Sequence, residues 1–309
     1  MSARRSRSSL YREAKVLFAK RDWRGRARTP RSATQHEPPD QAYEFPTGWA
    51  RMAAVRVARQ GIQRAGLTPL TWSLTKPEVR GREYLDKLTG PVVFVANHSS
   101  HLDTPLILGS LPTRYARRIA VGAAADYFFD ARWRAAVTAL VFNAFPVERY
   151  RSRRLRSLAP QLLARGWSLL LYPEGTRSED GWMSLMRLGA AQLCVSRHVP
   201  AVPIVLRGTY AAMPRGRNWP IPGRPRVVVR YGEPLSPVEG ESARTFNTRL
   251  ARAVSQLWAE EEMGWYQSLR AQAGGELALP TGPKVASWRR SWESTRPLAS
   301  RRPPAAWRD

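Results

Sequence analysis

Short apolar runs that end abruptly at polar or glycine-containing turns recur through the middle of the chain. Residues 92–96 end at Asn-His, residues 168–172 end at Pro-Glu-Gly, and residues 201–206 end at Arg-Gly. A short apolar run bounded by proline, glycine or polar residues predicts a buried strand. Further candidate strands of the same kind are residues 118–123, 144–147 and 226–230.

Between these runs, apolar side chains recur at the spacing of an α-helix. The spacing predicts a long helix over residues 242–262, with Phe246, Leu250 and Val254 on one face. Alternating strands and helices of these lengths predict an α/β fold, a single domain over residues 70–265 with a largely parallel central sheet flanked by helices. The shorter predicted helices are residues 102–111, 131–142, 151–165 and 185–197.

The two ends of the chain differ in composition from this domain. Residues 1–45 are rich in Arg, Ser and Pro without a sustained apolar period, which predicts a basic disordered tail. Residues 266–309 form a second tail, rich in Pro, Arg and Trp, and we expect disorder beyond Gly275. Within it, Trp288 and Trp292 are four positions apart among arginines, which would suit an interfacial contact.

Residues 46–69 have the pattern of a basic amphipathic helix. Apolar residues alternate loosely at helical spacing with four arginines. Such a helix can lie at an anionic membrane surface, where each Lys or Arg contributes on the order of 1 kcal/mol. It can also pack on the domain and leave its basic face in water, and the sequence leaves both alternatives open. The arginines are Arg51, Arg56, Arg59 and Arg64.

Charge narrows the class of partner. The chain of 309 residues has 50 Lys and Arg against 24 Asp and Glu, a formal net charge of +26. Such an excess favours an anionic partner, which could be a membrane surface, a phosphorylated substrate or nucleic acid. Biased genomic composition is the alternative explanation for the many arginines. We do not expect nucleic acid as the partner, because no recognisable nucleic-acid-binding module accompanies the basic tail.

Three further patterns limit the function. Cys194 is the only cysteine, so no internal disulfide or cysteine zinc cluster can form, and its apolar helical surroundings predict a buried thiol. The longest nearly apolar run, residues 135–147, is shorter than the ~20 residues of a transmembrane helix. The N-terminus lacks the apolar core of a secretion signal. We therefore expect a cytoplasmic protein that associates peripherally with the inner face of the membrane.

Candidate chemistry gathers where the predicted strands end. His98 follows residues 92–96, and Asp103 follows His98 by five positions. In open α/β sheets, ligands bind beyond the carboxyl ends of the strands. A histidine there with a carboxylate close behind it is a candidate general base with an orienting partner. Positions five apart on a helix do not face each other, so the chain must turn before the helix begins. His101 is the alternative base.

A second loop has the composition of an anion-binding turn. After residues 168–172 the chain reads Pro-Glu-Gly-Thr-Arg-Ser. Glycine and small hydroxyl residues favour a tight turn that exposes backbone N–H groups, and Arg177 adds a planar cation suited to phosphate. Arg149 follows the predicted strand over residues 144–147. Together these strand ends would place a base beside a cationic pocket, as suits a hydroxyl nucleophile on a phosphorylated molecule.

These residues resemble the motifs of the glycerolipid (lysophospholipid) acyltransferases, which include the 1-acylglycerol-3-phosphate acyltransferases. The family's His-x4-Asp motif matches His98 and Asp103. Its aromatic-Pro-Glu-Gly-Thr-Arg-Ser motif matches residues 172–178, and an apolar motif with prolines matches residues 199–204. Arg149 matches the arginine of a further motif. All four motifs occur in the family's order.

The resemblance implies an acyl transfer. By resemblance, His98 removes the proton from an acceptor hydroxyl, which attacks the thioester carbonyl of acyl-CoA or acyl carrier protein. Asp103 would orient His98 and stabilise the imidazolium. General-base catalysis of this kind is typically worth about 10²–10⁴-fold in rate. The acyl thioester is a co-substrate, and the chemistry implies no metal and no other cofactor.

The resemblance also implies where the phosphate of the acceptor binds. The two arginines of the motifs would hold it, and the backbone of the glycine and threonine would assist. The glutamate would belong to the same pocket and pair with an arginine or a glycerol hydroxyl. One position departs from the family pattern, because Asn143 stands where glycine is usual, six positions before the arginine. The residues implied for this pocket are Arg149, Glu174, Gly175, Thr176 and Arg177.

The expected function is the transfer of a fatty acyl group to the hydroxyl of a lysophosphatidate-like acceptor in phospholipid biosynthesis. The motifs do not separate this phosphorylated lysolipid from glycerol-3-phosphate or from other lysolipids. A function of another class also stays open, that of a non-catalytic basic protein that binds lipid or nucleic acid.

Overall fold

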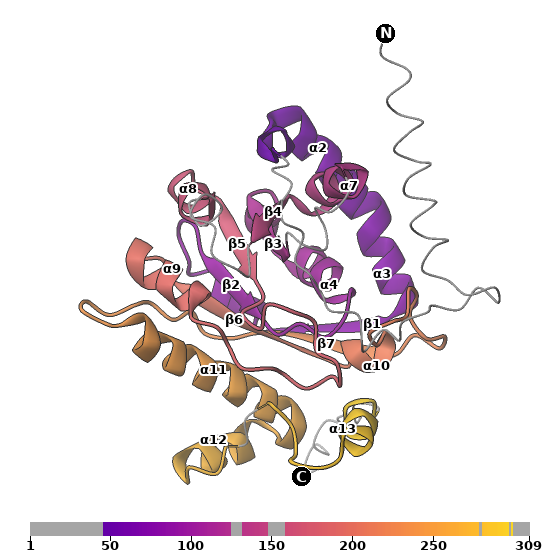
Figure 1. The fold of residues 1–309 in the computed structure, drawn as a ribbon, viewed down its shortest axis with the longest axis vertical. Coiled ribbons are helices and arrows are strands. Elements are labelled where there is room, and N and C mark those ends of the chain that lie inside the picture. Colours follow the sequence, from indigo (N-terminus) through magenta and orange to yellow (C-terminus); the bar gives the residue numbers. More distant parts are fainter. Residues whose placement is uncertain (1–45, 125–131, 148–157, 278–279, 297, 299–309) are drawn as a thin grey trace, which may run out of the picture. The chain divides into compact units, whose positions relative to one another are not determined.

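A seven-stranded sheet lies at the centre of the fold, with helices on both faces (Figure 1). The computed structural model describes residues 46–124, 132–147, 158–277, 280–296 and 298. Within these residues the strands follow the order β1-β7-β6-β2-β5-β3-β4. The strands are β1 Lys76–Arg80, β2 Val93–Ala96, β3 Ile119–Ala124, β4 Ala144–Val147, β5 Ser168–Leu171, β6 Ala201–Arg207 and β7 Arg226–Tyr231.

Neighbouring strands of this sheet are parallel except for β6 and β7, which pair antiparallel. The prediction of a largely parallel sheet is therefore confirmed. β1 and β7 run against the direction of the other five strands. β1 was not predicted because its sequence, Lys-Pro-Glu-Val-Arg, is mostly polar and half exposed, which a strand at the edge of a sheet tolerates.

The helices divide between the two faces of the sheet. α3 and α4 cover one face, and α8, α9 and α11 cover the other (Figure 1). Three predicted helices, residues 102–111, 131–142 and 242–262, match α4, α7 and α11 to within one residue at each end. The helix bounds are α2 Ala53–Gly61, α3 Thr68–Leu74, α4 Asp103–Ser110, α5 Thr113–Ala116, α7 Arg132–Phe142, α8 Leu158–Ala164, α9 Gly189–Arg197, α10 Thr209–Ala212, α11 Ala243–Met263, α12 Trp265–Ala273 and α13 Ser287–Ser294, with shorter turns η1 Gly48–Arg51, η2 Ile62–Leu67 and η3 Arg82–Leu85.

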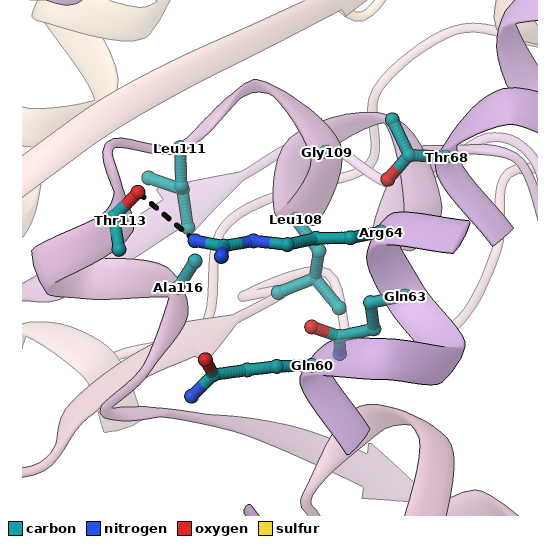
Figure 2. A pocket seen from close by; sticks show the side chains of 9 residues that line it. All are labelled: Gln60, Gln63, Arg64, Thr68, Leu108, Gly109, Leu111, Thr113 and Ala116. Carbon is teal, nitrogen blue, oxygen red and sulfur yellow. Dashed lines mark hydrogen bonds between the residues drawn. The ribbon is translucent and has the colours of Figure 1, made fainter. Parts of the chain in front are cut away.

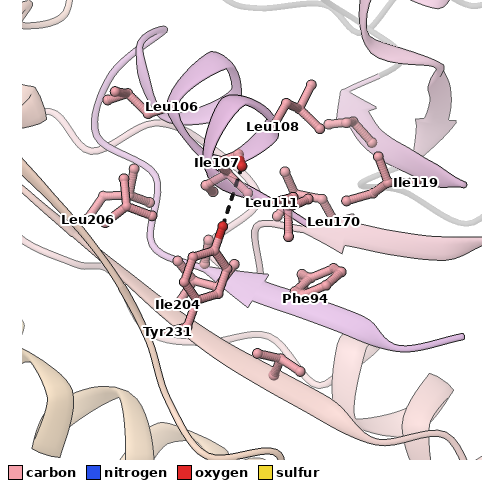
Figure 3. Packing of buried hydrophobic residues seen from close by; sticks show 14 of the residues in the cluster. Phe94, Leu106, Ile107, Leu108, Leu111, Ile119, Leu170, Ile204, Leu206 and Tyr231 are labelled. Carbon is pink, nitrogen blue, oxygen red and sulfur yellow. Dashed lines mark hydrogen bonds between the residues drawn. The ribbon is translucent and has the colours of Figure 1, made fainter. Parts of the chain in front are cut away.

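Strand β2 shows how the two apolar layers form. Phe94 packs on the face covered by α4, in the cluster drawn in Figure 3. Val93 and Val95 point to the opposite face and pack with α9 and α11. Because both faces are buried, the strand reads as an unbroken apolar run, which is the pattern that predicted it. Burying a side chain of this size stabilises the fold by about 1.5–3 kcal/mol.

The single cysteine belongs to the second of these layers. Cys194 lies on α9 with 0% of its surface exposed, so the predicted buried thiol is confirmed. Burial raises the pKa of this thiol to about 12. The side chain therefore contributes packing, as a small apolar residue would.

The predicted amphipathic helix forms α2 and α3, joined by the π-helical turn η2, and reaches Leu74. The arginines of this helix do not all lie on an exposed basic face, as their spacing had suggested. Arg59 is only 4% exposed and donates to the carbonyls of Leu140, at 2.7 Å, and Ala139, at 3.1 Å. It satisfies carbonyl groups of the last turn of α7. The expectation that Arg59 meets lipid or water is therefore wrong.

Residues after 265 contribute two helices, α12 and α13. The prediction of disorder beyond Gly275 is wrong for residues 287–294. Arg290 on α13 pairs with Asp180 at 2.6 Å, a partner 110 positions away in the sequence. Contacts at that separation leave no local periodic signal, which explains why the composition of this segment suggested a tail.

Some predictions fall on residues that the structure does not describe. The predicted tail over residues 1–45, Arg149, and residues 151–157 of a predicted helix lie outside the described residues. Among the residues that are described, none of the helices is long and apolar enough to cross a bilayer.

Candidate active site

His98 and Asp103 face each other across a turn at the carboxyl end of β2. His98 Nδ1 lies 2.9 Å from Asp103 Oδ2. The predicted contact is confirmed, and it is possible because α4 begins only at Asp103. The carboxylate side chain is fully buried, whereas the imidazole is 17% exposed. The histidine can therefore meet a substrate while its partner stays out of water.

Asp103 is held by three donors that converge on one oxygen. In addition to His98, the backbone N–H groups of Ser99 and Ser100 donate to Oδ2 at 2.7 Å and 2.8 Å. These bonds fix the carboxylate relative to the turn. With the proton of the imidazole on Nδ1, facing the carboxylate, Nε2 is the ring nitrogen with a free lone pair. That nitrogen can take a proton from a bound hydroxyl.

The turn is also anchored to distant parts of the chain. The side chain of Asn97 donates to the Leu206 carbonyl at 3.1 Å and accepts from the Leu206 N–H at 2.7 Å. It thereby extends the pairing of β2 with β6 by one residue. Ser100 Oγ donates to the Met213 carbonyl at 2.9 Å. The side chains of Asn97 and Ser100 therefore fix the backbone on either side of His98.

The loop after β5 lies against His98 because β2 and β5 are parallel neighbours in the sheet. The ring of Tyr172 stacks on the imidazole, with centroids 4.0 Å apart and planes at 21°. Its hydroxyl bonds with Thr104 Oγ1 at 2.8 Å. Further along, the Ser178 N–H donates to the His98 carbonyl at 2.8 Å. The two predicted motif loops therefore meet at one histidine.

Glu174 has hydrogen-bond partners other than the ones predicted. It is 3% exposed, and its two carboxylate oxygens accept from the backbone N–H groups of His98, at 2.7 Å, and Ser184, at 2.8 Å. Burial raises the pKa of Glu174 to about 8, although these two N–H donors act in the opposite direction. Its partners are thus backbone N–H groups, where an arginine or a glycerol hydroxyl was expected. Glu174 is a positioning residue for His98.

Gly175 sits where the loop reverses, with φ at 75°. Its N–H donates to the Tyr172 carbonyl at 3.0 Å, so in this conformation that N–H is used within the turn and does not face a phosphate. A methyl group added here would lie 3.0 Å from Cζ of Arg187. The guanidinium of Arg187 therefore lies directly against the Gly175 α-carbon.

Arg187 is a residue that the sequence analysis missed. It is exposed, and its backbone N–H donates to the Pro173 carbonyl at 3.0 Å, which fixes it beside the loop. No motif marked it, since it is separated from Arg177 by ten positions of irregular chain. An exposed arginine held against a glycine turn could have been suspected only once the path of residues 178–188 was known.

The remaining residues predicted for the phosphate pocket lie on this loop or beyond the described chain. Thr176 is exposed and Arg177 is half-buried. Arg149 lies outside the described residues. Asn143, which stands at the usual glycine, has φ at 50° and donates from Nδ2 to the Ile119 carbonyl at 2.7 Å. Asparagine tolerates this left-handed conformation better than most residues, so the backbone form that glycine permits is kept.

His101 is a poorer base than His98. Burial first, and then the positive charges of Arg177 and His98, lower the pKa of His101 to about 4, against the opposing effect of Asp103. A histidine with so low a pKa holds a proton weakly at neutral pH. His98, in contrast, has the carboxylate partner.

A separate hollow of about 230 Å³ lies at the other end of α4 (Figure 2). Its lining comes from the end of α2, η2, the start of α3, the end of α4 and α5, and Arg64 crosses it to donate to Thr113 Oγ1 at 3.0 Å. Asp103 is the first residue of α4, whereas the hollow is lined by Leu108 and Gly109 near its end. This hollow therefore does not contain the His98 chemistry.

The region that holds these residues is similar to known acyltransferases. The family model described as Acyltransferase matches residues 76–207. A protein of Chlamydomonas reinhardtii named as a 1-acyl-sn-glycerol-3-phosphate acyltransferase is 30% identical over 183 residues, which is 58% of this chain and 53% of that protein. The 1-acyl-sn-glycerol-3-phosphate acyltransferase alpha of Mus musculus is 32% identical over 174 residues, 53% of this chain and 55% of its own length. The chain spans about half the length of these curated relatives.

A solved structure shares the fold. The crystal structure of the 1-acyl-sn-glycerophosphate (LPA) acyltransferase PlsC from Thermotoga maritima superimposes with a TM-score of 0.50 and 27% sequence identity. The similarity covers 67% of this chain and 82% of that one. The family match over residues 76–207 includes both motif loops, residues 98–103 and 172–178. Residues 76–207 are thus identified by the Acyltransferase family model, and the chain is similar in sequence and in fold to proteins named as 1-acyl-sn-glycerol-3-phosphate acyltransferases.

Proposed function

We propose that the protein transfers a fatty acyl group from a thioester to the hydroxyl of a lysophosphatidate-like acceptor, as a step of phospholipid synthesis. The observation that carries the proposal is the 2.9 Å contact between His98 Nδ1 and the buried Asp103 carboxylate. The names of the relatives support this acceptor, since they describe 1-acyl-sn-glycerol-3-phosphate acyltransferases. Acyl-CoA and acyl carrier protein are the two candidate donors.

The proposed reaction begins with proton removal. His98 Nε2 takes the proton of the acceptor hydroxyl as the oxygen attacks the thioester carbon, so that a carbon–oxygen bond forms. Asp103 stabilises the imidazolium through Nδ1. The carbon–sulfur bond then breaks, and the proton returns from Nε2 to the sulfur, which leaves as a free thiol. Positioned general-base catalysis is worth about 10²–10⁴-fold in rate.

The acceptor's phosphate would bind beside the Gly175 turn. Arg187 lies against Gly175, and Arg177 is close enough to lower the pKa of His101 by its charge. Two guanidinium groups next to the base suit a phosphorylated acceptor, because arginine binds phosphate in a bidentate manner. Thr176 is exposed at the same turn. Arg149 and the Thr176 backbone stay part of this proposal.

The experiment compares His98→Ala with a matched histidine variant, His198→Asn. His198 ends α9 with φ at 52°, a conformation that asparagine accepts. Thioester cleavage with lysophosphatidate should fall about 10²–10⁴-fold in His98→Ala and stay near the wild-type rate in His198→Asn. Undiminished turnover of His98→Ala would contradict the proposed base. A wild-type protein without turnover on lysophosphatidate, glycerol-3-phosphate or other lysolipids, with either donor, would contradict the proposed reaction.

We also propose that the protein works peripherally at an anionic membrane surface. The net charge of +26 supports this, and so do the apolar side chains that α2 and its neighbours expose. Met52 is 62% and Val57 71% exposed, and Arg64, further along the same helical segment, is exposed as well. An exposed apolar side chain next to arginine suits the boundary between lipid tails and headgroups. Each arginine near that surface contributes about 1 kcal/mol.

The membrane proposal predicts a change in binding to vesicles. Replacing Met52 and Val57 with serine should weaken sedimentation with anionic vesicles, since both side chains would leave the lipid. Val238→Ser is the matched control, because Val238 is 61% exposed on another part of the chain. Raising the salt concentration should weaken binding of all three proteins. Equal sedimentation of the double variant and the control would show that α2 does not contact lipid.

A further inference from the structure

Residues 178–184 bind the backbone of His98 directly at one end and through Glu174 at the other end. At one end, the Ser178 N–H donates to the His98 carbonyl at 2.8 Å. At the other end, the Ser184 N–H donates to Glu174, whose second oxygen accepts from the His98 N–H. The backbone of His98 is therefore held on both its N–H and its carbonyl by this segment and by Glu174. Any displacement of residues 178–184 would be passed directly to His98.

Within the segment, local bonds keep a tight loop. Ser178 Oγ donates to the Trp182 carbonyl at 2.7 Å and accepts from the Gly181 N–H at 2.8 Å. Asp180 Oδ1 accepts from the Trp182 N–H at 3.1 Å. Gly181 has φ at 85°, a conformation that favours glycine. These bonds give the loop its shape but do not attach it to the rest of the fold.

The loop packs on α11, where the rings of Trp182 and Trp258 lie 6.0 Å apart. Residues 280–296, which lie outside the region of the family match, attach it further by hydrogen bonds. Arg290 Nε donates to Asp180 Oδ2 at 2.6 Å, and the Arg290 carbonyl accepts from Trp182 Nε1 at 2.9 Å. Ser294 Oγ donates to the Asp180 carbonyl. The Met183 N–H donates to the Pro280 carbonyl at 2.9 Å. Side-chain and backbone groups of both segments take part, so α13 and the irregular chain before it bind the loop at several points.

Arg290 is suited to this role by its own setting. Its two remaining nitrogens donate to the carbonyls of Pro283, at 2.8 Å, and Thr281, at 2.9 Å. The planar guanidinium therefore connects the 178–184 loop with the irregular stretch that precedes α13. The side chains of Arg290 and Asp180 are each 25% exposed, so the pair is partly shielded from solvent. Its neighbour Arg289 is 57% exposed and pairs with Glu293 on the same helix.

We infer that residues 280–296, through Arg290 of α13, are a positioning element that holds the 178–184 loop and thereby fixes His98 for proton transfer. The inference rests on the proposed role of His98 as the general base. Arg290 touches no reacting atom and acts only through the loop. A misplacement of about 1 Å at a catalytic group can cost roughly 10²-fold in rate, so a segment far from the chemistry can control turnover.

The experiment uses the full chain and compares Arg290→Ala with Arg289→Ala, which removes the same charge from the next position of α13. In Arg290→Ala, kcat for thioester cleavage should fall about 10-fold to 100-fold, while KM for the acceptor changes by less than about twofold. Arg289→Ala should match the wild type in both. Arg290→Lys, which keeps the charge and one bond to Asp180, should recover part of kcat. Ser294→Ala is a milder variant and should lower kcat in the same direction.

A spectroscopic measurement separates this inference from the proposed reaction. In protein with ¹⁵N-labelled histidine, the imidazole signals of His98, assigned by their loss in His98→Ala, should shift in Arg290→Ala and stay in place in Arg289→Ala. Thermal unfolding of each variant checks that the fold is intact. Unchanged His98 signals together with unchanged kcat in Arg290→Ala would overturn the inference. If the His98 signals shift in Arg290→Ala but the wild-type protein cleaves no thioester, the link between Arg290 and His98 stands and only the proposed reaction is overturned.

Discussion

The two loops that meet at His98 are built in different ways. In the turn from His98 to Asp103, the three donors to Asp103 Oδ2 lie within five positions of the carboxylate. The loop after β5 is held by distant partners. Glu174 is 76 positions from His98, and Asp180 is 110 positions from Arg290.

This difference concerns what each loop needs in order to form. Closing a short turn costs little chain entropy, so the His98–Asp103 geometry follows once β2 and α4 are in place. The loop after β5 needs the sheet and the C-terminal segment together. We therefore expect changes in the turn to damage the chemistry more than the stability, and changes in the loop to damage both.

The largest expected effect comes from the turn. Asp103→Asn can still accept from the Ser99 and Ser100 N–H groups, but a neutral amide cannot stabilise the imidazolium. We expect kcat to fall about 10²–10⁴-fold with a small change in melting temperature. Steady-state thioester cleavage and thermal unfolding measure the two quantities. Ser110→Ala, which alters the far end of α4, is the control. A loss of kcat of less than about threefold would argue against an orienting carboxylate.

Glu174→Gln tests the point at which the two loops join. The amide nitrogen cannot accept, so either the His98 or the Ser184 N–H loses its acceptor. Leaving a buried donor without a partner costs about 1–3 kcal/mol of unfolding free energy. Turnover should fall as well, because His98 is released on one side. Glu179→Gln is the control, because the side chain of Glu179 is 84% exposed.

The same substitution should change how stability depends on pH. Burial raises the pKa of Glu174 from 4.5 to about 8, so the folded protein holds this proton more tightly than the unfolded chain. The resulting stabilisation is fully present below pH 4.5 and is lost as the pH rises through about 8. Urea unfolding across this range should show a shallower decline for Glu174→Gln than for the wild type. Parallel curves would mean that Glu174 does not titrate in this way.

Gly175→Ala separates backbone strain from contact with Arg187. Gly175 and Gly240 both have φ at 75°, but an added methyl group would meet Arg187 only at Gly175 and nothing within 4 Å at Gly240. Alanine in this conformation costs about 1–2 kcal/mol, so both variants should lose similar unfolding free energy. KM for a phosphorylated acceptor should rise only in Gly175→Ala, because Arg187 must move. An equal rise in Gly240→Ala would remove Arg187 from the proposed phosphate site.

The smallest effect is expected from Tyr172→Phe. The change removes the hydroxyl bonded to Thr104 at 2.8 Å but keeps the ring that stacks on His98. A hydrogen bond of this kind contributes about 0.5–1.5 kcal/mol, and turnover should stay within about threefold of the wild type. Tyr172→Leu, which also loses the stacked ring, should lower kcat further. Equal kcat for the two variants would show that the stack does not help to position His98.

Where sequence reasoning succeeded, the signal was local. The run of apolar residues in β2 predicted a buried strand, and the five-position spacing required a turn between His98 and Asp103 if the two side chains were to meet. Where it failed, the residue type suggested one environment and the fold supplied another. Arg59 reads as part of a basic face, yet it is buried against carbonyls of α7. Glu174 reads as a partner for a cation, yet it accepts two backbone N–H groups.

The sequence by itself determined the alternating strands and helices and the turn that His98 and Asp103 need in order to meet, because both depend on residues close together in the chain. The largely parallel sheet followed from the alternation, since parallel neighbours need a crossover connection, usually a helix. Only the tertiary structure decided which groups hold that pair in place. The partners of Glu174 and Arg290 are distant in the sequence, and Arg187 lies against a glycine that the chain reaches again only after an irregular stretch. The physical reason is that a hydrogen bond depends on distance and direction in space, and sequence periodicity carries that information only within a single helix, strand or turn.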